Sequence, residues 1–162
     1  MSFLLDPPSS SLGPQEIVEV FAKYSEYLNS IRNALPQFAY EFAVAPWHYN
    51  ARDHRSPHDS WVESLTISEP ATGSRHENRH LEIAVRLLGA YHDGYLELSY
   101  PEVQSYSFIG ASHAAENAGH GDWLVDELRL SERGLVLHEI LFRSGSRWLI
   151  EAKDIRVTWE QN

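Results

Sequence analysis

The sequence predicts an α+β fold, with one long N-terminal helix packed on an antiparallel β-sheet. Between residues 14 and 35 the apolar residues recur at spacings of three and four, as on one face of a helix. From residue 38 onward they alternate with polar or small residues, as on the two faces of a strand. Short turns join these segments, and such turns imply antiparallel pairing. We therefore expect about eight strands in a strongly curved meander, as an open sheet or a half-barrel.

The helix is expected to begin at Pro14 and to end before Pro36. Proline is favoured at the first helical position because its missing N–H needs no partner there. Glu16 and Glu19 place negative charge near the positive end of the helix dipole. The apolar stripe of this helix consists of Ile17, Phe21, Tyr24, Leu28, Ile31 and Leu35.

A first strand is expected at residues 38–45, where Phe38, Tyr40, Phe42 and Val44 alternate with other residues. Further strands are expected at Trp61–Ile67, Leu81–Leu87, Tyr95–Tyr100 (interrupted by Pro101 and resumed at Val103–Ile109), Trp123–Leu130, Leu135–Phe142, Arg147–Ala152 and Ile155–Trp159. His92-Asp93-Gly94 predicts a tight turn, and residues 110–121 predict a loop.

Length and composition indicate one globular domain. The chain has 162 residues, of which 43% are hydrophobic and 22% charged, as in ordinary globular proteins. It has no cysteine, which excludes disulfides, thiolate nucleophiles and iron–sulfur clusters and fits a reducing compartment. The sequence contains neither a signal peptide nor an apolar run of the ~18 residues that a membrane helix needs. We expect a cytoplasmic domain at residues 14–162, preceded by an extended Pro/Ser-rich lead at residues 1–13.

The net charge of −10, from 13 basic and 23 acidic side chains, argues against a nucleic-acid partner. An acidic surface keeps a domain soluble, and it also steers the domain toward a basic protein partner. Both interpretations remain open, as do a monomeric and a homodimeric state.

A histidine-rich stretch suggests a metal site as an alternative to ordinary loop histidines. Its candidate ligands are His48, His54, His58 and Asp59. Their spacing matches no recognised zinc pattern, and Pro57 prevents the helix that would place His54 and His58 on one face. Exposed loop histidines are therefore the simpler interpretation, and no cofactor is expected.

No segment carries a convincing catalytic motif. Residues 110–114 (Gly-Ala-Ser-His-Ala) resemble a nucleophile elbow only loosely, because Ala114 stands where the motif has glycine. Neighbours in a strand point to opposite faces, so residues 58–60 (His-Asp-Ser) cannot form a triad. The same rule separates Asp126 from Glu127, and we expect Glu127 to face solvent.

Two features point to binding. His138-Glu139 lies in an apolar strand, so one of the two must face the core unless the strand bulges, and a structural histidine is the simpler interpretation. Four aromatic residues, Trp47, Tyr49, Trp61 and Trp123, lie in or beside loops and are candidates for an interface or a pocket wall. The candidate binding residues are these four together with Asp126, Glu127, His138 and Glu139.

Residues 58–159 resemble a class of known proteins. The pattern runs from His58-Asp59-Ser60-Trp61 through residues 95–100 (Tyr-Leu-Glu-Leu-Ser-Tyr) and closes with Trp123, Asp126-Glu127, Gly134, His138-Glu139, Gly145 and Asp154. It is similar to small bacterial β-rich proteins of unknown function, some of which are similar to immunity proteins of polymorphic-toxin systems. The resemblance implies no catalytic residues. It implies a role by analogy, the neutralisation of a partner protein.

The sequence thus leads to two hypotheses. The first is a non-enzymatic protein-binding module, immunity-like, that docks on a partner with a basic surface. The second is a small-molecule-binding or metal-assisted enzyme with a pocket on the concave sheet face. The mouth of that pocket would be lined by His48, His54, His58 and Asp59, with His113 or His120.

Overall fold

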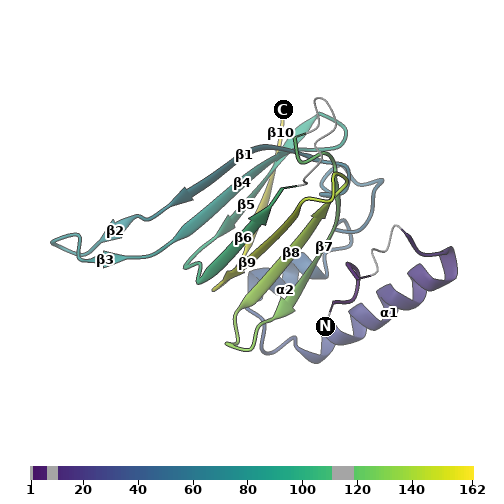
Figure 1. The fold of residues 1–162 in the computed structure, drawn as a ribbon, viewed down its shortest axis with the longest axis horizontal. Helices are drawn as coiled ribbons and strands as arrows, with labels where there is room; N and C mark the ends of the chain where they lie inside the picture. The colour runs from purple at the N-terminus through teal and green to yellow at the C-terminus, as the bar shows by residue number, and fades with distance from the viewer. Residues whose placement is uncertain (1, 7–10, 111–118) are drawn as a thin grey trace.

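The chain begins with two helices and continues with antiparallel strands (Figure 1). The computed structural model describes residues 2–6, 11–110 and 119–162. Within these residues the helices are α1 (Pro14–Ser30) and α2 (Gln37–Ala43). The strands are β1 (Trp61–Ser68), β2 (Ala71–Thr72), β3 (Asn78–Arg79), β4 (Glu82–Leu88), β5 (Gly94–Tyr100), β6 (Ser105–Ile109), β7 (Trp123–Leu130), β8 (Val136–Phe142), β9 (Arg147–Ala152) and β10 (Arg156–Gln161). The predicted α+β class is confirmed, with most of the structure in strands.

The strands form two four-stranded sheets, not the single meander that we expected. One sheet has the order β1-β4-β5-β10, the other has the order β6-β9-β8-β7, and β2 and β3 form a separate pair. Both predicted halves of the interrupted strand exist, because β5 continues into β6 across the bend that begins at Pro101. Opposite that bend, β9 continues into β10, so a two-stranded ribbon passes from one sheet into the other. Strands that change sheet at a bend make the corner of a β-sandwich.

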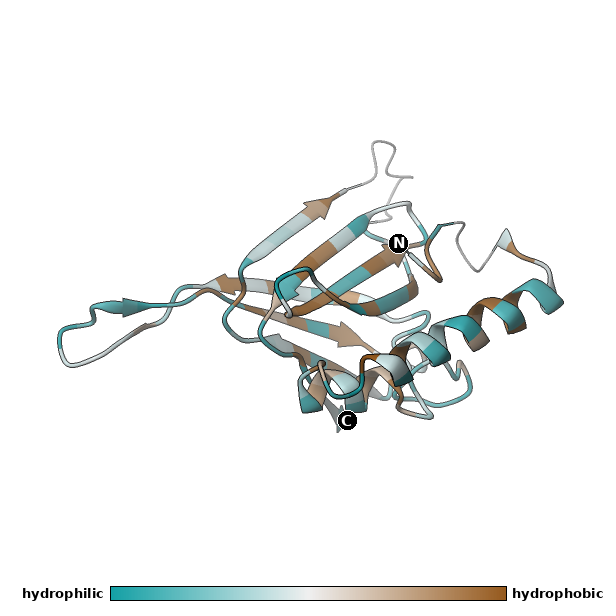
Figure 2. Cartoon of the chain, turned by 90° about the horizontal axis from the view of Figure 1, so that it is seen from below, coloured by the Kyte–Doolittle hydropathy of each residue, from teal (hydrophilic) through white to brown (hydrophobic). Residues whose placement is uncertain are grey.

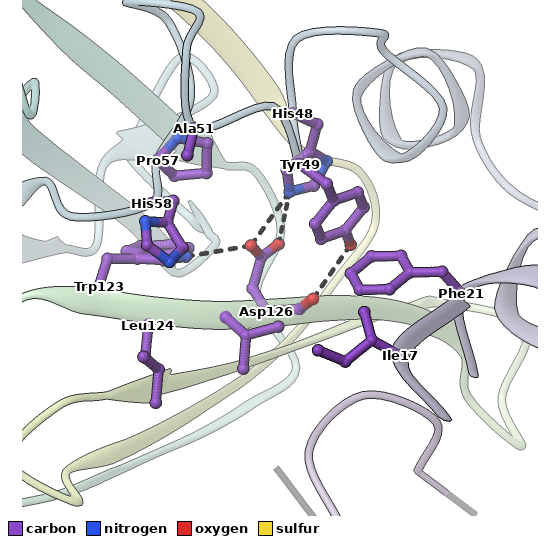
Figure 3. Close-up of a pocket in the computed structure, with 11 residues that line it drawn as sticks. Ile17, Phe21, His48, Tyr49, Ala51, Pro57, His58, Trp123, Leu124 and Asp126 are labelled. Atoms are coloured by element: carbon purple, nitrogen blue, oxygen red, sulfur yellow. Dashed lines mark hydrogen bonds and ion pairs between the residues drawn. The ribbon is translucent and has the colours of Figure 1, made fainter. Parts of the chain in front are cut away.

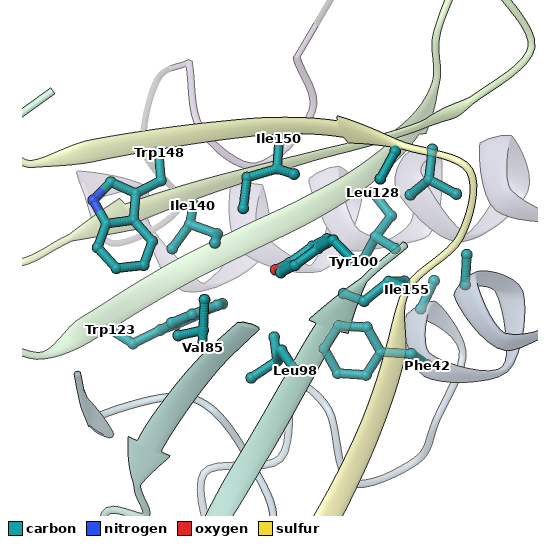
Figure 4. Close-up of a cluster of buried hydrophobic side chains, with 14 of the residues drawn as sticks. Phe42, Val85, Leu98, Tyr100, Trp123, Leu128, Ile140, Trp148, Ile150 and Ile155 are labelled. Carbon is teal, nitrogen blue, oxygen red and sulfur yellow. The ribbon is translucent and has the colours of Figure 1, made fainter. Parts of the chain in front are cut away.

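One core lies between the two sheets. Figure 4 shows Val85 and Leu98 of the first sheet close to Ile140 and Trp148 of the second, and all four side chains are buried. Burial of each such side chain stabilises the fold by ~1.5–3 kcal/mol. The core therefore explains why the inward positions of the predicted strands are apolar.

Helix α1 keeps its predicted start and its apolar stripe but ends at Ser30 instead of residue 35. Tyr24 and Leu28 of the stripe are buried within α1, and Leu35 is buried beyond its end. Asn29 and Ser30 favour a helix end because their short polar side chains compete for backbone groups. The Ser30 hydroxyl indeed donates to the carbonyl oxygen of Tyr27 at 2.7 Å.

Helix α2 replaces the strand that we predicted at residues 38–45. Its buried residues are Ala39, Phe42 and Ala43, which have helical spacing. Phe38 and Val44, which the alternation placed on the buried face, are 46% and 43% exposed. The alternation misled because Gln37, Ala39 and Glu41, which precede the three aromatic residues of α2, favour a helix. Helix α2 contacts β10 and β7, the edge strands of the two sheets.

Three tyrosine hydroxyls occupy backbone groups on the free edge of β7. The Tyr24 hydroxyl accepts from the amide of Leu128 at 2.7 Å and donates to its carbonyl oxygen at 3.1 Å. The Tyr27 hydroxyl accepts from the amide of Leu130 at 2.9 Å, and the Tyr49 hydroxyl donates to a third backbone group of β7. An exposed edge strand pairs readily with another chain, so these side chains protect the fold from aggregation.

At the other end of the molecule, β1 and β4 continue into the β2–β3 hairpin. This hairpin projects beyond both sheets, and Figure 2 shows that it is mainly hydrophilic. The predicted turn at residues 92–94 is present, with a positive φ of 58° at His92. None of the helices in the described part of the chain is both long and apolar enough to cross a membrane.

Part of the predicted N-terminal lead is packed against the rest of the chain. Residues 2–6 lie against the second sheet, and Leu4 and Leu5 are fully buried. Residues 1 and 7–10 of the lead lie outside the described residues, as do residues 111–118 of the predicted loop.

Candidate functional site

A buried carboxylate, Asp126, is the centre of a polar cluster in the core. A register shift between Trp123 and Val125 of β7 lets Trp123 and Asp126 face the same interior. His48 Nε2 lies 3.0 Å from Asp126 Oδ1 and 2.9 Å from Oδ2. His138 Nε2 lies 2.9 Å from Oδ2, and the indole nitrogen of Trp123 donates to Oδ1 at 3.0 Å. Both carboxylate oxygens are thus fully engaged.

The hydrogen-bond partners assign protons to both nitrogens of His48. Its Nδ1 lies 2.9 Å from the carbonyl oxygen of Phe42, which can only accept, and its Nε2 faces the carboxylate. Two acceptors require two N–H groups, so His48 is an imidazolium ion. Its ring is stacked between Phe42 and Tyr49, with both centroid distances 4.0 Å. Aromatic faces attract a cation, which supports the same assignment.

His138 is assigned as the neutral partner in the cluster. Its Nε2 donates to Asp126, and its Nδ1 lies 2.8 Å from the hydroxyl of Tyr100. The hydroxyl can donate to this nitrogen, so every polar atom finds a partner without a second buried positive charge. One positive and one negative charge then cancel within the cluster.

Two opposing effects act on the pKa of Asp126. Burial raises it, but the charge of His48 and the hydrogen bonds from His138 and His48 prevail and hold the pKa well below its ordinary value. The pKa of Tyr100 is raised well above its usual value by burial. Asp126 is therefore ionised and Tyr100 protonated at neutral pH.

Above this cluster lies a pocket of about 270 Å³ between α1, the segment after α2 and the start of β7 (Figure 3). Its lining is mainly apolar and consists of Ile17, Phe21, His48, Tyr49, Ala51, Pro57, His58, Trp123, Leu124, Val125 and Asp126. The half-exposed His58 has its Nδ1 3.1 Å from Asp59 Oδ2. The pocket offers a hydrophobic wall, with the buried ion pair forming part of its boundary.

The polar cluster is suited to holding the fold and not to moving a proton to a substrate. A general base needs a lone pair that faces the reacting group. Both nitrogens of His48 and His138 and both oxygens of Asp126 already have protein partners. Their side chains are also no more than 2% exposed. What remains for a ligand is the apolar pocket.

A comparison with models of known protein families finds no match. A comparison with curated proteins finds none either. The site must therefore be interpreted from its own geometry.

The structure brings together half of the eight predicted binding residues. Tyr49, Trp123 and Asp126 line the pocket, and His138 lies directly behind Asp126. A fifth candidate, Trp47, does not line the pocket. It packs on Phe42 instead, and the Arg55 guanidinium lies 5.6 Å from its ring.

The other three candidates lie elsewhere. Trp61 is 49% exposed, and its indole nitrogen donates to Asp122 at 2.8 Å. Glu127 and Glu139 face away from the core, on the outer side of the second sheet, with Arg129 between them. The expected solvent exposure of Glu127 is wrong, because the residue is fully buried and accepts the amide hydrogens of Phe3 and Leu4.

The candidate metal ligands are not gathered into one site. His48 is buried with Asp126, His54 lies 2.5 Å from Asp93, and His58 faces Asp59. Among residues 2–6, 11–110 and 119–162, no group of three or more potential ligands is placed to hold an ion. His120 packs on Trp148 with a centroid distance of 4.9 Å and does not line the pocket, and residue 113 lies outside the described residues.

Two members of the cluster were missed by sequence reasoning. Tyr100 is inward-facing because it shares the alternation of Leu96 and Leu98 in β5, which the sequence does show. The sequence suggests His48 only as a metal ligand or as a residue at the mouth of a pocket, because no sequence signal connects it to an aspartate 78 residues away. Such long-range partners become visible only in the fold.

Proposed function

We propose that this protein is a non-enzymatic protein-binding module whose pocket accepts an apolar side chain of a partner protein. The observation that carries the proposal is the pocket itself. Its walls are apolar, and the ion pair beside it is already satisfied. A pocket of about 270 Å³ is just below the usual size range for small-molecule sites and suits one large side chain. Hot spots of protein interfaces are typically such anchors in desolvated pockets.

Two exposed apolar residues lie on or beside segments that line the pocket. Val18 is 68% exposed on α1, the helix that contributes Ile17 and Phe21 to the lining. Trp61 is also exposed and bonds to Asp122, which precedes the pocket-lining Trp123. Exposed apolar residues of this kind support a role in protein binding.

Charge favours a partner with a basic surface. The chain carries a net charge of −10, so long-range attraction would accelerate association with a basic protein and slow it with an acidic one. Together with the resemblance of residues 58–159 to immunity-like bacterial proteins, this supports a role in neutralising a basic partner.

The test is affinity capture from the native host with three baits. Ala51→Trp fills the pocket from its exposed rim, whereas Ala22→Trp adds the same side chain to an exposed position of α1 outside the pocket lining. We expect one partner to be retained by the wild type and by Ala22→Trp and to be lost with Ala51→Trp. Equal retention by all three baits would contradict the proposal.

The same pocket supports a second candidate function, the binding of a small apolar ligand. Its mainly apolar lining with a single half-exposed imidazole, that of His58, favours this alternative. Native mass spectrometry of gently purified protein distinguishes the two. An added mass that is present in the wild type, unaffected by a chelator and absent in Ala51→Trp would establish a small ligand. An added mass removed by the chelator would instead revive the metal hypothesis.

A further inference from the structure

A second built site lies on the outer face of the β6-β9-β8-β7 sheet, opposite the Asp126 cluster. There residues 2–6 lie on a contact surface, hereafter the groove, that is formed by Tyr27, Glu127 and Arg147, with Glu139 beside Arg147. Leu4 and Leu5 are fully buried. This groove shares no lining residue with the pocket on the other side of β7, so its role is independent of the proposed function.

The groove binds the backbone of this segment. One oxygen of Glu127, Oε2, accepts the amide hydrogens of both Phe3 and Leu4, at 2.8 Å and 2.7 Å. The other oxygen lies 2.9 Å from Arg129 Nε. Hydrogen bonds that a carboxylate accepts from backbone amides are among the stronger ones in proteins. Glu127 therefore has the position and the partners of a peptide-binding residue.

Contacts on both sides of these hydrogen bonds fix the register. The ring of Phe3 stacks on Tyr27 of α1 with a centroid distance of 4.7 Å. At the other end, Arg147 lies 3.1 Å from Asp6 Oδ1 and 3.1 Å from Glu139 Oε1. The segment thus presents to the groove, in order, an aromatic residue, two buried leucines and an acidic residue.

Residues 2–6 bind to residues that are far away in the sequence, as a separate peptide ligand would. The segment's two hydrogen bonds with Glu127 join residues that are separated by 124 and 123 positions in the sequence. Its bond with Arg147 joins residues that are separated by 141 positions. We propose that the groove also accepts residues 2–6 of a second copy of this chain, giving a reciprocal dimer. Each chain carries one groove and one matching segment, so an exchange restores every contact and closes a two-fold symmetric pair. The attached segment prevails at low protein concentration, and exchange requires a high one.

The test combines two complementary variants. Leu4→Asp prevents residues 2–6 from binding and leaves the groove of that chain empty. Glu127→Ala prevents the groove from binding and leaves residues 2–6 of that chain unbound. In sedimentation velocity at high concentration we expect each variant alone to be a monomer and the mixture to contain a 1:1 heterodimer. The wild type, refolded at high concentration, should show a dimer fraction that rises with concentration. Monomers in the mixture and in the wild type would overturn the proposal.

A synthetic peptide with the sequence of residues 2–6 supplies the matched control. It should bind the Leu4→Asp variant, and it should dissociate the wild-type dimer, a readout that needs no variant to fold. A peptide with methyl groups on the amide nitrogens that correspond to Phe3 and Leu4 keeps every side chain but cannot donate to Glu127. We expect it to bind at least about tenfold more weakly. Equal binding of the two peptides would overturn the role of Glu127. Peptide binding without any dimer would overturn the second copy as occupant.

Discussion

The substitution Asp126→Asn removes the negative charge around which the buried cluster is built. In the wild type the carboxylate accepts from His48, His138 and Trp123 at 2.9–3.0 Å. Asparagine keeps one acceptor oxygen but turns an NH₂ group toward N–H donors. It also leaves the His48 imidazolium without a counter-ion. Breaking one side of a buried ion pair costs about 3–5 kcal/mol, so we expect the free energy of unfolding to fall by that amount.

Urea unfolding followed by tryptophan fluorescence measures this loss, with an unchanged m-value as the check that unfolding remains two-state. The matched control is Asp122→Asn, which breaks the half-exposed pair with Arg143, whose two atoms lie 2.7 Å apart. Exposed pairs contribute about 0–1 kcal/mol. A loss for Asp126→Asn no larger than that of the control would refute the reasoning.

The same substitution has a predicted pH dependence. Because the pKa of Asp126 is lower in the folded protein than its ordinary value, the carboxylate stabilises the fold fully above the unfolded pKa of about 3.9. This stabilisation is lost as the pH falls toward the lower folded pKa. The difference between wild type and Asp126→Asn should therefore shrink as the pH falls below about 4. A difference that grows as the pH falls below about 4 would contradict the assignment.

Two further substitutions and one control substitution test the packing around the sheets, all by urea unfolding. Tyr24→Phe deletes the hydroxyl that satisfies both backbone groups of Leu128 on the β7 edge. It should lower the free energy of unfolding by about 1–3 kcal/mol and promote aggregation. An unchanged unfolding midpoint would contradict the role of this hydroxyl at the β7 edge. Gly94→Ala places a Cβ in steric conflict with the ring of Trp159 and should cost about 1–3 kcal/mol, whereas Gly110→Ala, which meets no atom within 4 Å, should cost under about 0.5 kcal/mol. Equal effects of the two glycine substitutions would contradict the predicted steric conflict, because the ring of Trp159 would then move aside at no cost.

The sequence predicted those parts of the fold that depend on local periodicity. The stripe residues from Phe21 to Leu35 pack in or against the core, although α1 ends at Ser30, and the inward alternation of Ile83, Val85 and Leu87 is present. Helix α2 was missed because its aromatic residues imitate a strand over seven residues, and only its contacts with both sheet edges decide the outcome. Local pattern is therefore a weaker guide in short segments than tertiary packing.

The candidate site was only partly predictable for the same reason. Asp126 and His138 could be singled out as polar residues in apolar strands, and β7 pairing with β8 then places them close together. His48 is the third member because the loop that carries it folds across the sandwich. The spacing of residues in the sequence does not predict the path of this loop. Glu127 was misjudged because the segment that buries it is more than 120 residues away in the chain.

The central claim is that the Asp126 cluster is a closed ion pair, and the proposed role of the pocket in binding a partner depends on it. Nitrogen-15 NMR of histidine side chains at neutral pH tests it most directly. The account predicts that His48 carries a proton on both ring nitrogens, whereas His138 carries one on Nε2 only. A His48 with one unprotonated nitrogen would contradict the account, because a single N–H cannot serve both the Asp126 carboxylate and the Phe42 carbonyl oxygen.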